Sequence, residues 1–181
     1  MPTALTLSGS IRKGSYNRLL QQHVGRQLEA AGVAVTAVDL GDFEMPIFNE
    51  DLEASQVPEA AVRLAELWRS HDIIFIATPE YNGSLPPLLV NAITWLSRQK
   101  PSVFRHAVFG IGGVSSGKYG TIFALSHLRD SLSKVGALVV PTLLGIGPAE
   151  TALDAEGNPT EPAIIRKVET IVHELTHFSR G

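Results

Sequence analysis

The sequence predicts an α/β fold built around a parallel β-sheet. Short apolar segments alternate five times with amphipathic segments of helical spacing along the 181 residues. The short segments are apolar on both sides, which is typical of strands covered by helices on both faces of a sheet. The chain length favours a single domain, residues 1–181, which would bury about 70% of the surface of its unfolded chain.

The first forty residues predict a strand, a helix and a second strand. Thr3–Ser8 is a nearly continuous apolar run, as expected of a buried strand. Asn17–Ala31 carries apolar residues at helical spacing, and Gly32 follows as a stop signal. Val33–Val38 alternates Val with Ala or Thr, which indicates the second strand.

The middle of the chain predicts one loop, two helices and the most apolar strand. Asp39–Val57 contains proline, asparagine and many acids, so we expect an ordered loop there. Pro58–Ser70 and Leu85–Ser97 are predicted helices with proline in the first turn. Between them, Asp72–Ala77 is predicted to be a buried strand that ends at Thr78-Pro79.

The last third continues the alternation. We expect a strand at His106–Ile111, a glycine- and serine-rich loop at Gly112–Gly120, and a helix at Thr121–Val135. A short strand at Ala137–Val140 would end at Pro141. The chain is then predicted to close with a loop over 145–160 and a helix at Glu161–Phe178.

Five such strands favour the flavodoxin-like three-layer fold, with strand order 2-1-3-4-5. Ligands of these sheets bind at the carboxyl ends of the strands, beside the point where the order reverses. The loops expected there are Ser8–Asn17, Thr78–Ser84 and Gly112–Gly120. They are also the three most unusual loops of the chain, so the sequence predicts a ligand site between them.

Composition narrows the range of functions. The net charge of −3 argues against general nucleic-acid binding. The chain has no cysteine, which excludes disulfides, a thiol nucleophile and a thiolate metal site and is consistent with a cytoplasmic location. No apolar run is long enough for a membrane span, and no signal peptide is evident, so no membrane partner is expected. Residues 1–27 contain four cations and no acid, which gives a favourable electrostatic field for a phosphate. Residues 28–62 contain eight acids and no lysine or arginine, as expected of a solvated face or the rim of an oligomer contact.

The first loop has the chemistry of a phosphate site. Gly9 and Gly14 allow a sharp turn close to a ligand, while serines provide hydroxyl donors. Ser15 or Asn17 can cap the following helix, whose free N–H groups attract anions. Arg12 offers a planar pair of donors suited to phosphate. The Walker A pattern fails, because Ser15 and Tyr16 stand where lysine and serine or threonine are required, and the dinucleotide pattern is absent from this turn.

The other two loops offer backbone groups. Thr78–Ser84 carries an aromatic ring, an amide and exposed donors around a glycine, against which a flat heterocycle could lie, although a proline-punctuated turn is an equally good interpretation of this segment alone. Gly112–Gly120 is a glycine-rich segment that could direct N–H dipoles at a negatively charged ring edge.

With these loops in view, the chain resembles the NAD(P)H-dependent FMN reductases of the flavodoxin-like superfamily, the group that includes chromate and quinone reductases. The resemblance spans about residues 4–140, and its first and third segments together are specific. The matching segments are Gly9-Ser10-x-Arg12-x-Gly14-Ser15-x-Asn17, Asp39-Leu40-x-x-Phe43-x-Met45-Pro46-x-Phe48-Asn49, Thr78-Pro79-Glu80-Tyr81-Asn82-Gly83-Ser84-x-Pro86 and Asn91-Ala92-Ile93-x-Trp95-Leu96-Ser97.

The resemblance implies an FMN site formed by all three loops. The FMN phosphate would be held by Ser10, Arg12, Ser15 and Asn17. The isoalloxazine ring would be lined by Pro79, Glu80, Tyr81, Asn82 and Gly83, with Glu80 acting through its backbone while its carboxylate bonds nearby or faces solvent. The pyrimidine edge would be approached by Gly113, Ser115, Ser116 and Gly117. Family members are commonly dimers or tetramers, and the loop at Phe43–Asp51 would help to form the subunit contact.

Such an enzyme would take hydride from NADPH or NADH onto flavin N5. It would pass the electrons to a small-molecule acceptor: a quinone, free flavin, azo compound or oxidised metal ion. The step needs no side-chain acid or base, so no catalytic residue and no metal ligand are predicted. The sequence leaves open the preferred donor, the physiological acceptor, the oligomeric state and whether FMN exchanges.

Three alternatives come from other motifs. A flavodoxin-type electron carrier would share the cofactor, but its phosphate loop is usually rich in threonine and lacks an arginine such as Arg12. A serine hydrolase using Ser115 is suggested by Gly113-x-Ser115-x-Gly117. A zinc protease is suggested by His173-Glu174-x-x-His177, but only four residues remain for a third ligand. The other histidines are expected to be structural or on the surface, and the two tryptophans are expected to pack in the core or at an interface.

Overall fold

The computed structural model describes residues 1–178 and contains one five-stranded parallel sheet. The strand order is β2-β1-β3-β4-β5, which confirms the predicted order and fold class. The strands are β1 (Thr3–Ser8), β2 (Ala34–Asp39), β3 (Ile73–Ala77), β4 (Val108–Val114) and β5 (Leu138–Ile146). The helices are α1 (Tyr16–Ala30), the 3-10 helix η1 (Leu40–Asp42), α2 (Glu50–Ser55), α3 (Glu59–Arg69), α4 (Pro87–Ser97), α5 (Ile122–Lys134), α6 (Ala149–Ala152) and α7 (Pro162–His177).

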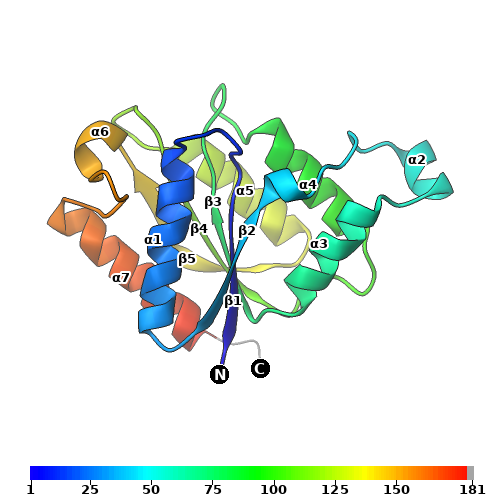
Figure 1. Cartoon of the computed structure of the whole chain (residues 1–181), viewed down its shortest axis with the longest axis horizontal. Helices are drawn as coiled ribbons and strands as arrows, with labels where there is room; N and C mark the ends of the chain where they lie inside the picture. The colour runs from blue at the N-terminus through cyan, green and yellow to red at the C-terminus, as the bar shows by residue number, and fades with distance from the viewer. Residues whose placement is uncertain (179–181) are drawn as a thin grey trace.

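Helices cover both faces of the sheet, giving three layers (Figure 1). The α1 and α7 helices pack on one face, against residues such as Ala4 and Phe75. The α3, α4 and α5 helices pack on the other face, against Leu5, Leu7 and Ile74. Successive strand residues alternate between these two clusters because the side-chain period of a strand is two. Within the described residues, no helix is long and apolar enough to cross a membrane.

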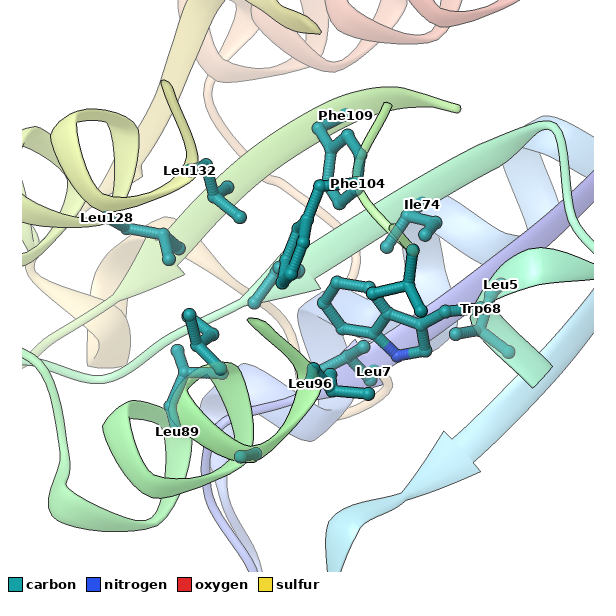
Figure 2. Packing of buried hydrophobic residues seen from close by; sticks show 14 of the residues in the cluster. Leu5, Leu7, Trp68, Ile74, Leu89, Leu96, Phe104, Phe109, Leu128 and Leu132 are labelled. Atoms are coloured by element: carbon teal, nitrogen blue, oxygen red, sulfur yellow. The ribbon is translucent and has the colours of Figure 1, made fainter. Parts of the chain in front are cut away.

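An aromatic cluster fills the core between α3, α4, α5 and the sheet (Figure 2). Trp68 meets Phe104 edge-on, with ring centroids 5.4 Å apart, and Phe109 at 5.7 Å. Trp95 is likewise fully buried, and its indole N–H donates to the carbonyl of Pro46 at 2.8 Å. Both tryptophans therefore have the structural role that was predicted for them.

The β4 strand is longer than predicted and includes Gly112 and Gly113. The two glycines suggested a loop, yet they allow close packing within the sheet. A Cβ on Gly113 would lie 2.0 Å from Thr121 Oγ1 and 2.3 Å from the carbonyl oxygen of Thr78. The loop predicted at Gly112–Gly120 therefore begins after Val114, three residues beyond the predicted position.

The β5 strand continues through Pro141, where the sequence predicted its end. It is an edge strand, and its register with β4 shifts between Phe109 and Ile111, so a proline is tolerated there. A side chain supplies hydrogen-bond donors to the carbonyl groups of this irregular segment. Arg129 Nη2 donates to the carbonyls of Val140 and Pro141, at 2.7 and 2.9 Å.

Two predicted loops also contain short helices. In the segment Asp39–Val57, η1 is followed by α2, whose N-terminus is capped by Asn49. The Asn49 Oδ1 atom accepts from the N–H groups of Asp51 and Leu52, at 2.8 and 3.1 Å. In the 145–160 segment, α6 forms a single turn. Both helices are too short for a clear apolar period, which explains why the sequence did not reveal them.

Candidate functional site

The loops that follow β1, β3 and β4 enclose a cavity at the carboxyl edge of the sheet. Its volume is about 260 Å³. The cavity lies where the strand order reverses, because the chain runs from β1 to the β2 edge and from β3 toward β5. Its lining comprises Ser10, Arg12, Ser15, Tyr16, Asn17, Pro79, Glu80, Tyr81, Val114, Ser115 and Ser116.

The first loop brings an uncapped helix N-terminus to this cavity. Gly14 adopts a φ of 66°, a left-handed conformation that turns the chain into α1. Ser15 occupies the N-cap position, but its side chain forms no capping hydrogen bond, and the first turn of α1 contains no acid. Ser10 and Ser15 are both buried at the cavity wall. Unpaired N–H groups and buried hydroxyls in this arrangement fit a phosphate group.

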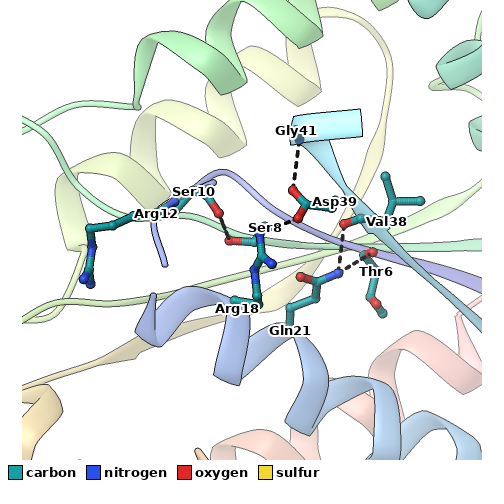
Figure 3. Close-up of polar contacts among 9 residues, drawn as sticks. All are labelled: Thr6, Ser8, Ser10, Arg12, Arg18, Gln21, Val38, Asp39 and Gly41. Atoms are coloured by element: carbon teal, nitrogen blue, oxygen red, sulfur yellow. Dashed lines mark hydrogen bonds and ion pairs between the residues drawn. The ribbon is translucent and has the colours of Figure 1, made fainter. Parts of the chain in front are cut away.

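Arg12 is the cation available to such a phosphate. Its guanidinium is exposed and donates from Nη1 to the carbonyl of Lys13 at 3.3 Å. Arg18, one turn into α1, is paired with the carboxylate of Asp39 (Figure 3). Among the described residues Arg12 has no acidic partner, so its charge remains free to act on an anionic ligand.

The second loop forms a tight hairpin beside the cavity. Tyr81 and Ser84 exchange backbone hydrogen bonds of 2.9 and 3.0 Å. Asn82 and Gly83 lie between them with φ values of 53° and 70°, the paired positive angles of the turn that Asn-Gly favours. Tyr81 is about half exposed (47%) and also lines a second, mainly apolar hollow of about 240 Å³ formed with Ile11, Pro86, Pro87 and Leu88. This hollow adjoins the cavity at Ser10, Arg12 and Tyr81, which line both.

The Glu80 carboxylate bonds to the neighbouring helix. Its Oε2 atom accepts from the backbone N–H groups of Phe123 and Ala124, both at 3.0 Å. These groups belong to the first turn of α5, so the second loop is attached to the helix that follows the third loop. The carboxylate thus bonds nearby, as expected from the sequence.

The third loop is attached to the first by Asn17. The Asn17 Nδ2 atom donates to the carbonyl of Val114 at 3.0 Å, and its Oδ1 accepts from the Val114 N–H at 2.9 Å. Ser115 Oγ closes the loop by donating to the carbonyl of Gly120 at 2.9 Å. Asn17 is buried and lies in the first turn of α1, so its main visible role is to join two walls of the cavity.

The cavity collects nine of the thirteen residues proposed for the site from the sequence. Asn82 and Gly83 form the hairpin turn, Gly113 is packed inside β4, and Gly117 lies further along the third loop; none of these four lines the cavity. Tyr16 and Val114 line it but were not predicted. Tyr16 stands inside the first motif and could have been found from it, whereas Val114 required knowing where β4 ends.

The two hydrolase motifs lack their partners in the described residues. Ser115 Oγ bonds to backbone carbonyls and not to a histidine. Glu174 accepts from the N–H and hydroxyl of Thr142, at 3.0 and 2.9 Å, and so supports β5. No group of three potential metal ligands exists in residues 1–178. The geometry gives no support to a serine hydrolase or a zinc protease.

Comparisons with known proteins place the chain among flavin-dependent reductases. Residues 2–151 match the family described as NADPH-dependent FMN reductase. An NAD(P)H-dependent FMN reductase of Pseudomonas aeruginosa is 39% identical over 84% of this chain and 82% of that protein. A 2-hydroxy-1,4-benzoquinone reductase of a Burkholderia species is 34% identical over 95% of this chain and 93% of that protein. The solved flavoenzyme FerB of Paracoccus denitrificans, an NAD(P)H:acceptor oxidoreductase, superposes with a TM-score of 0.81 at 28% identity, covering 99% of this chain and 100% of that chain.

Proposed function

Because the chain belongs to the NADPH-dependent FMN reductase family, we propose that it is an NAD(P)H-dependent, FMN-containing reductase. It delivers electrons to a small-molecule acceptor such as a quinone, free flavin, azo compound or oxidised metal ion. The observation that carries the proposal is the cavity beside the hairpin, where the uncapped N-terminus of α1, two buried serines and Arg12 converge.

These residues fit FMN at its phosphate end. Ser10, Ser15 and the first-turn N–H groups of α1 would donate to the phosphate oxygens, and Arg12 would neutralise its charge. Asn17 would hold the first loop against Val114 while lining the same site. Within residues 1–178, no acidic side chain pairs with the buried serines or the N-terminus of α1, and a phosphate would supply that partner.

The ring end would lie between the second and third loops. Pro79, Glu80 and Tyr81 line one side of the cavity, with Asn82 and Gly83 forming the hairpin behind them, and Ser115 and Ser116 line the other. Gly113 and Gly117 shape the third loop. When bound, FMN supplies hydride acceptance from a nicotinamide and electron delivery to the acceptor. The protein binds and orients, and no side-chain acid or base is required.

The apolar hollow next to Tyr81 supports a flat organic acceptor. Most of its wall comes from Gly9, Ile11, Pro86, Pro87 and Leu88, and it shares Ser10, Arg12 and Tyr81 with the cofactor cavity. Apolar walls with an aromatic side chain at the edge suit a quinone or azo compound more than a hydrated ion. The acceptor would therefore approach from this side.

A homodimer or homotetramer that works in the cytoplasm is part of the proposal. Large apolar side chains remain exposed around the site, notably Ile11 (55%), Tyr119 (78%), Ile122 (51%) and Phe123 (61%). A second copy would remove this surface from water. Size-exclusion chromatography with light scattering would test it, and a monomeric mass at micromolar concentration would contradict it.

The decisive experiment is anaerobic spectroscopy of the purified protein with FMN. We expect a perturbed flavin spectrum on mixing, followed by complete bleaching when NADPH or NADH is added and no radical signal in electron paramagnetic resonance. Reoxidation by 1,4-benzoquinone would then show turnover. Flavin binding without direct reduction by either nucleotide would favour a flavodoxin-type electron carrier, and no flavin binding would overturn the proposal.

A further inference from the structure

The α5 helix lacks a cap from its own sequence. Thr121 occupies its N-cap position, yet its side chain forms no capping hydrogen bond. The Thr121 hydroxyl is fully buried and has no hydrogen-bond partner among the described residues. It lies against Gly113, where a Cβ would come within 2.0 Å of it. The first turn of α5 also contains no acidic residue, so its N–H groups need an acceptor from elsewhere.

Glu80 supplies that acceptor from a distance of 43 residues in the chain. Its Oε2 atom accepts from Phe123 and Ala124, which are the second and third residues of the helix and the two donors that an N-cap side chain normally satisfies. A carboxylate at this place is also favoured by the positive end of the helix dipole. Glu80 thus acts as the N-cap of a helix to which it is not adjacent.

The cap connects the two loops that flank the ring end of the cavity. Glu80 immediately precedes the hairpin of Tyr81–Ser84, and α5 immediately follows the third loop. A second contact joins the other end of the hairpin to α5, because Ser84 Oγ lies 3.2 Å from Nδ1 of His127. That contact is exposed, whereas the bond from Glu80 to Ala124 is partly buried, so Glu80 is the stronger attachment.

We propose that Glu80 is a positioning residue for the flavin ring: by capping α5 it holds the hairpin and the third loop at a fixed separation, and its charge offsets the positive end of α5 beside the ring. This inference rests on the proposed function. It assigns Glu80 a role through other residues, because its visible hydrogen bonds go to backbone N–H groups rather than into the cavity.

The charge gives the proposal a signature that simple scaffolding would lack. A helix N-terminus carries about half a positive charge, so a full carboxylate there leaves the start of α5 net negative. Glutamine in its place keeps an oxygen acceptor for the two N–H groups but removes the charge. The flavin gains negative charge on reduction, so Glu80→Gln should make its reduction potential more positive while retaining the cap.

Amide hydrogen exchange on FMN-free protein tests the cap by itself. In Glu80→Ala, the amides of Phe123 and Ala124, together with those of Tyr81 and Ser84, should exchange at least about fivefold faster. Glu80→Gln should restore most of the protection. The matched control is Glu29→Gln, an exposed glutamate near the end of α1 farthest from the site, which should leave all four amides unchanged. Unchanged exchange in Glu80→Ala would overturn the proposal.

Flavin titration and potentiometry then test the effect on the ring. We expect FMN binding to be about tenfold weaker in Glu80→Ala and within about threefold of wild type in Glu80→Gln. The reduction potential of the flavin should become more positive in Glu80→Gln and should not change in the control Glu29→Gln. Equal FMN affinity in wild type and Glu80→Ala, or an unchanged potential in Glu80→Gln, would contradict the positioning role. Failure of the wild type to bind FMN would instead overturn the proposed function and the flavin part of this inference, while the exchange data still decide the cap.

Discussion

Asn17 and Val114 exchange two hydrogen bonds, although they are 97 residues apart in the chain. The side-chain amide of Asn17 donates to the carbonyl and accepts from the N–H of the same residue, as a neighbouring strand would. At its end, β4 therefore forms hydrogen bonds with a side chain of α1 in the way that it would with a neighbouring strand. This junction joins the first loop to the third loop, and both loops line the cavity.

Asn17→Ala should destabilise the protein and weaken FMN binding. It leaves a buried N–H and a buried carbonyl of Val114 without partners, at a cost of about 2–4 kcal/mol in the free energy of unfolding. Urea unfolding of the FMN-free protein would measure this. In Asn17→Asp, the carboxylate can still accept from the N–H but adds a negative charge beside the phosphate site. We expect it to lose less stability than Asn17→Ala but more FMN affinity; the reverse order would contradict this role.

Arg12→Ala should act on FMN binding and not on folding. Hydrogen bonds to charged groups contribute about 1.5–3 kcal/mol, so the dissociation constant for FMN should rise roughly 10- to 150-fold. At saturating FMN, the rate of nucleotide oxidation should fall far less. Fluorescence titration and steady-state kinetics measure the two effects. The control is Lys167→Ala, which removes an exposed cation of α7. An unchanged FMN affinity in Arg12→Ala would contradict a role for Arg12 in binding FMN.

Two glycine substitutions should have opposite effects on stability. Gly113→Ala places a Cβ 2.0 Å from Thr121 Oγ1 and 2.3 Å from a backbone oxygen; such overpacking costs at least about 1–3 kcal/mol. Gly25→Ala lies inside α1, where the nearest atom would be 3.6 Å away, so the helix should gain up to about 1 kcal/mol. Thermal unfolding of both variants checks this. An unchanged stability in Gly113→Ala would show that the end of β4 has more room than its packing indicates.

His23 should make the protein less stable as the pH falls below neutrality. Burial lowers the pKa of His23 from its ordinary value of 6.5, and the hydrogen bond to Asn158 offsets this only in part. Below pH 6.5 the unfolded chain binds a proton that the folded protein resists, so the free energy of unfolding decreases. Above that pH both states are neutral at this site and the effect disappears.

His23→Gln should flatten this dependence between pH 7 and pH 5, as measured by urea unfolding at each pH. The hydrogen bond from the Thr3 N–H lowers the pKa of Asp72 from its ordinary value of 3.8, so the stability it contributes is lost only at more acidic pH and does not interfere in this window. An equal slope in wild type and His23→Gln would rule out His23 as the cause.

Local sequence patterns were sufficient to predict the layers, the strand order and the loops that line the cavity. The strands are short runs that are apolar on both sides, and the helices have a repeating apolar face, so local pattern and burial agree along most of the chain. The chemistry of the first loop was also readable, because glycine, serine and arginine beside a helix start have few other uses. These features could be predicted because each depends mainly on residues that are close together in the sequence.

The way in which the loops are joined depends on contacts between distant parts of the chain and could not be predicted from the sequence. Glu80 caps a helix through residues 43 and 44 positions away, and Asn17 pairs with a strand end 97 residues away; neither contact leaves a local pattern. The glycines of β4 suggested a loop because their need for close packing against Thr121 and Leu144 arises from other elements. Pro141 suggested a strand end because nothing local shows that β5 is an edge strand whose carbonyls Arg129 satisfies. The sequence predicted most of the residues that line the cavity, whereas long-range hydrogen bonds and packing hold these residues in place.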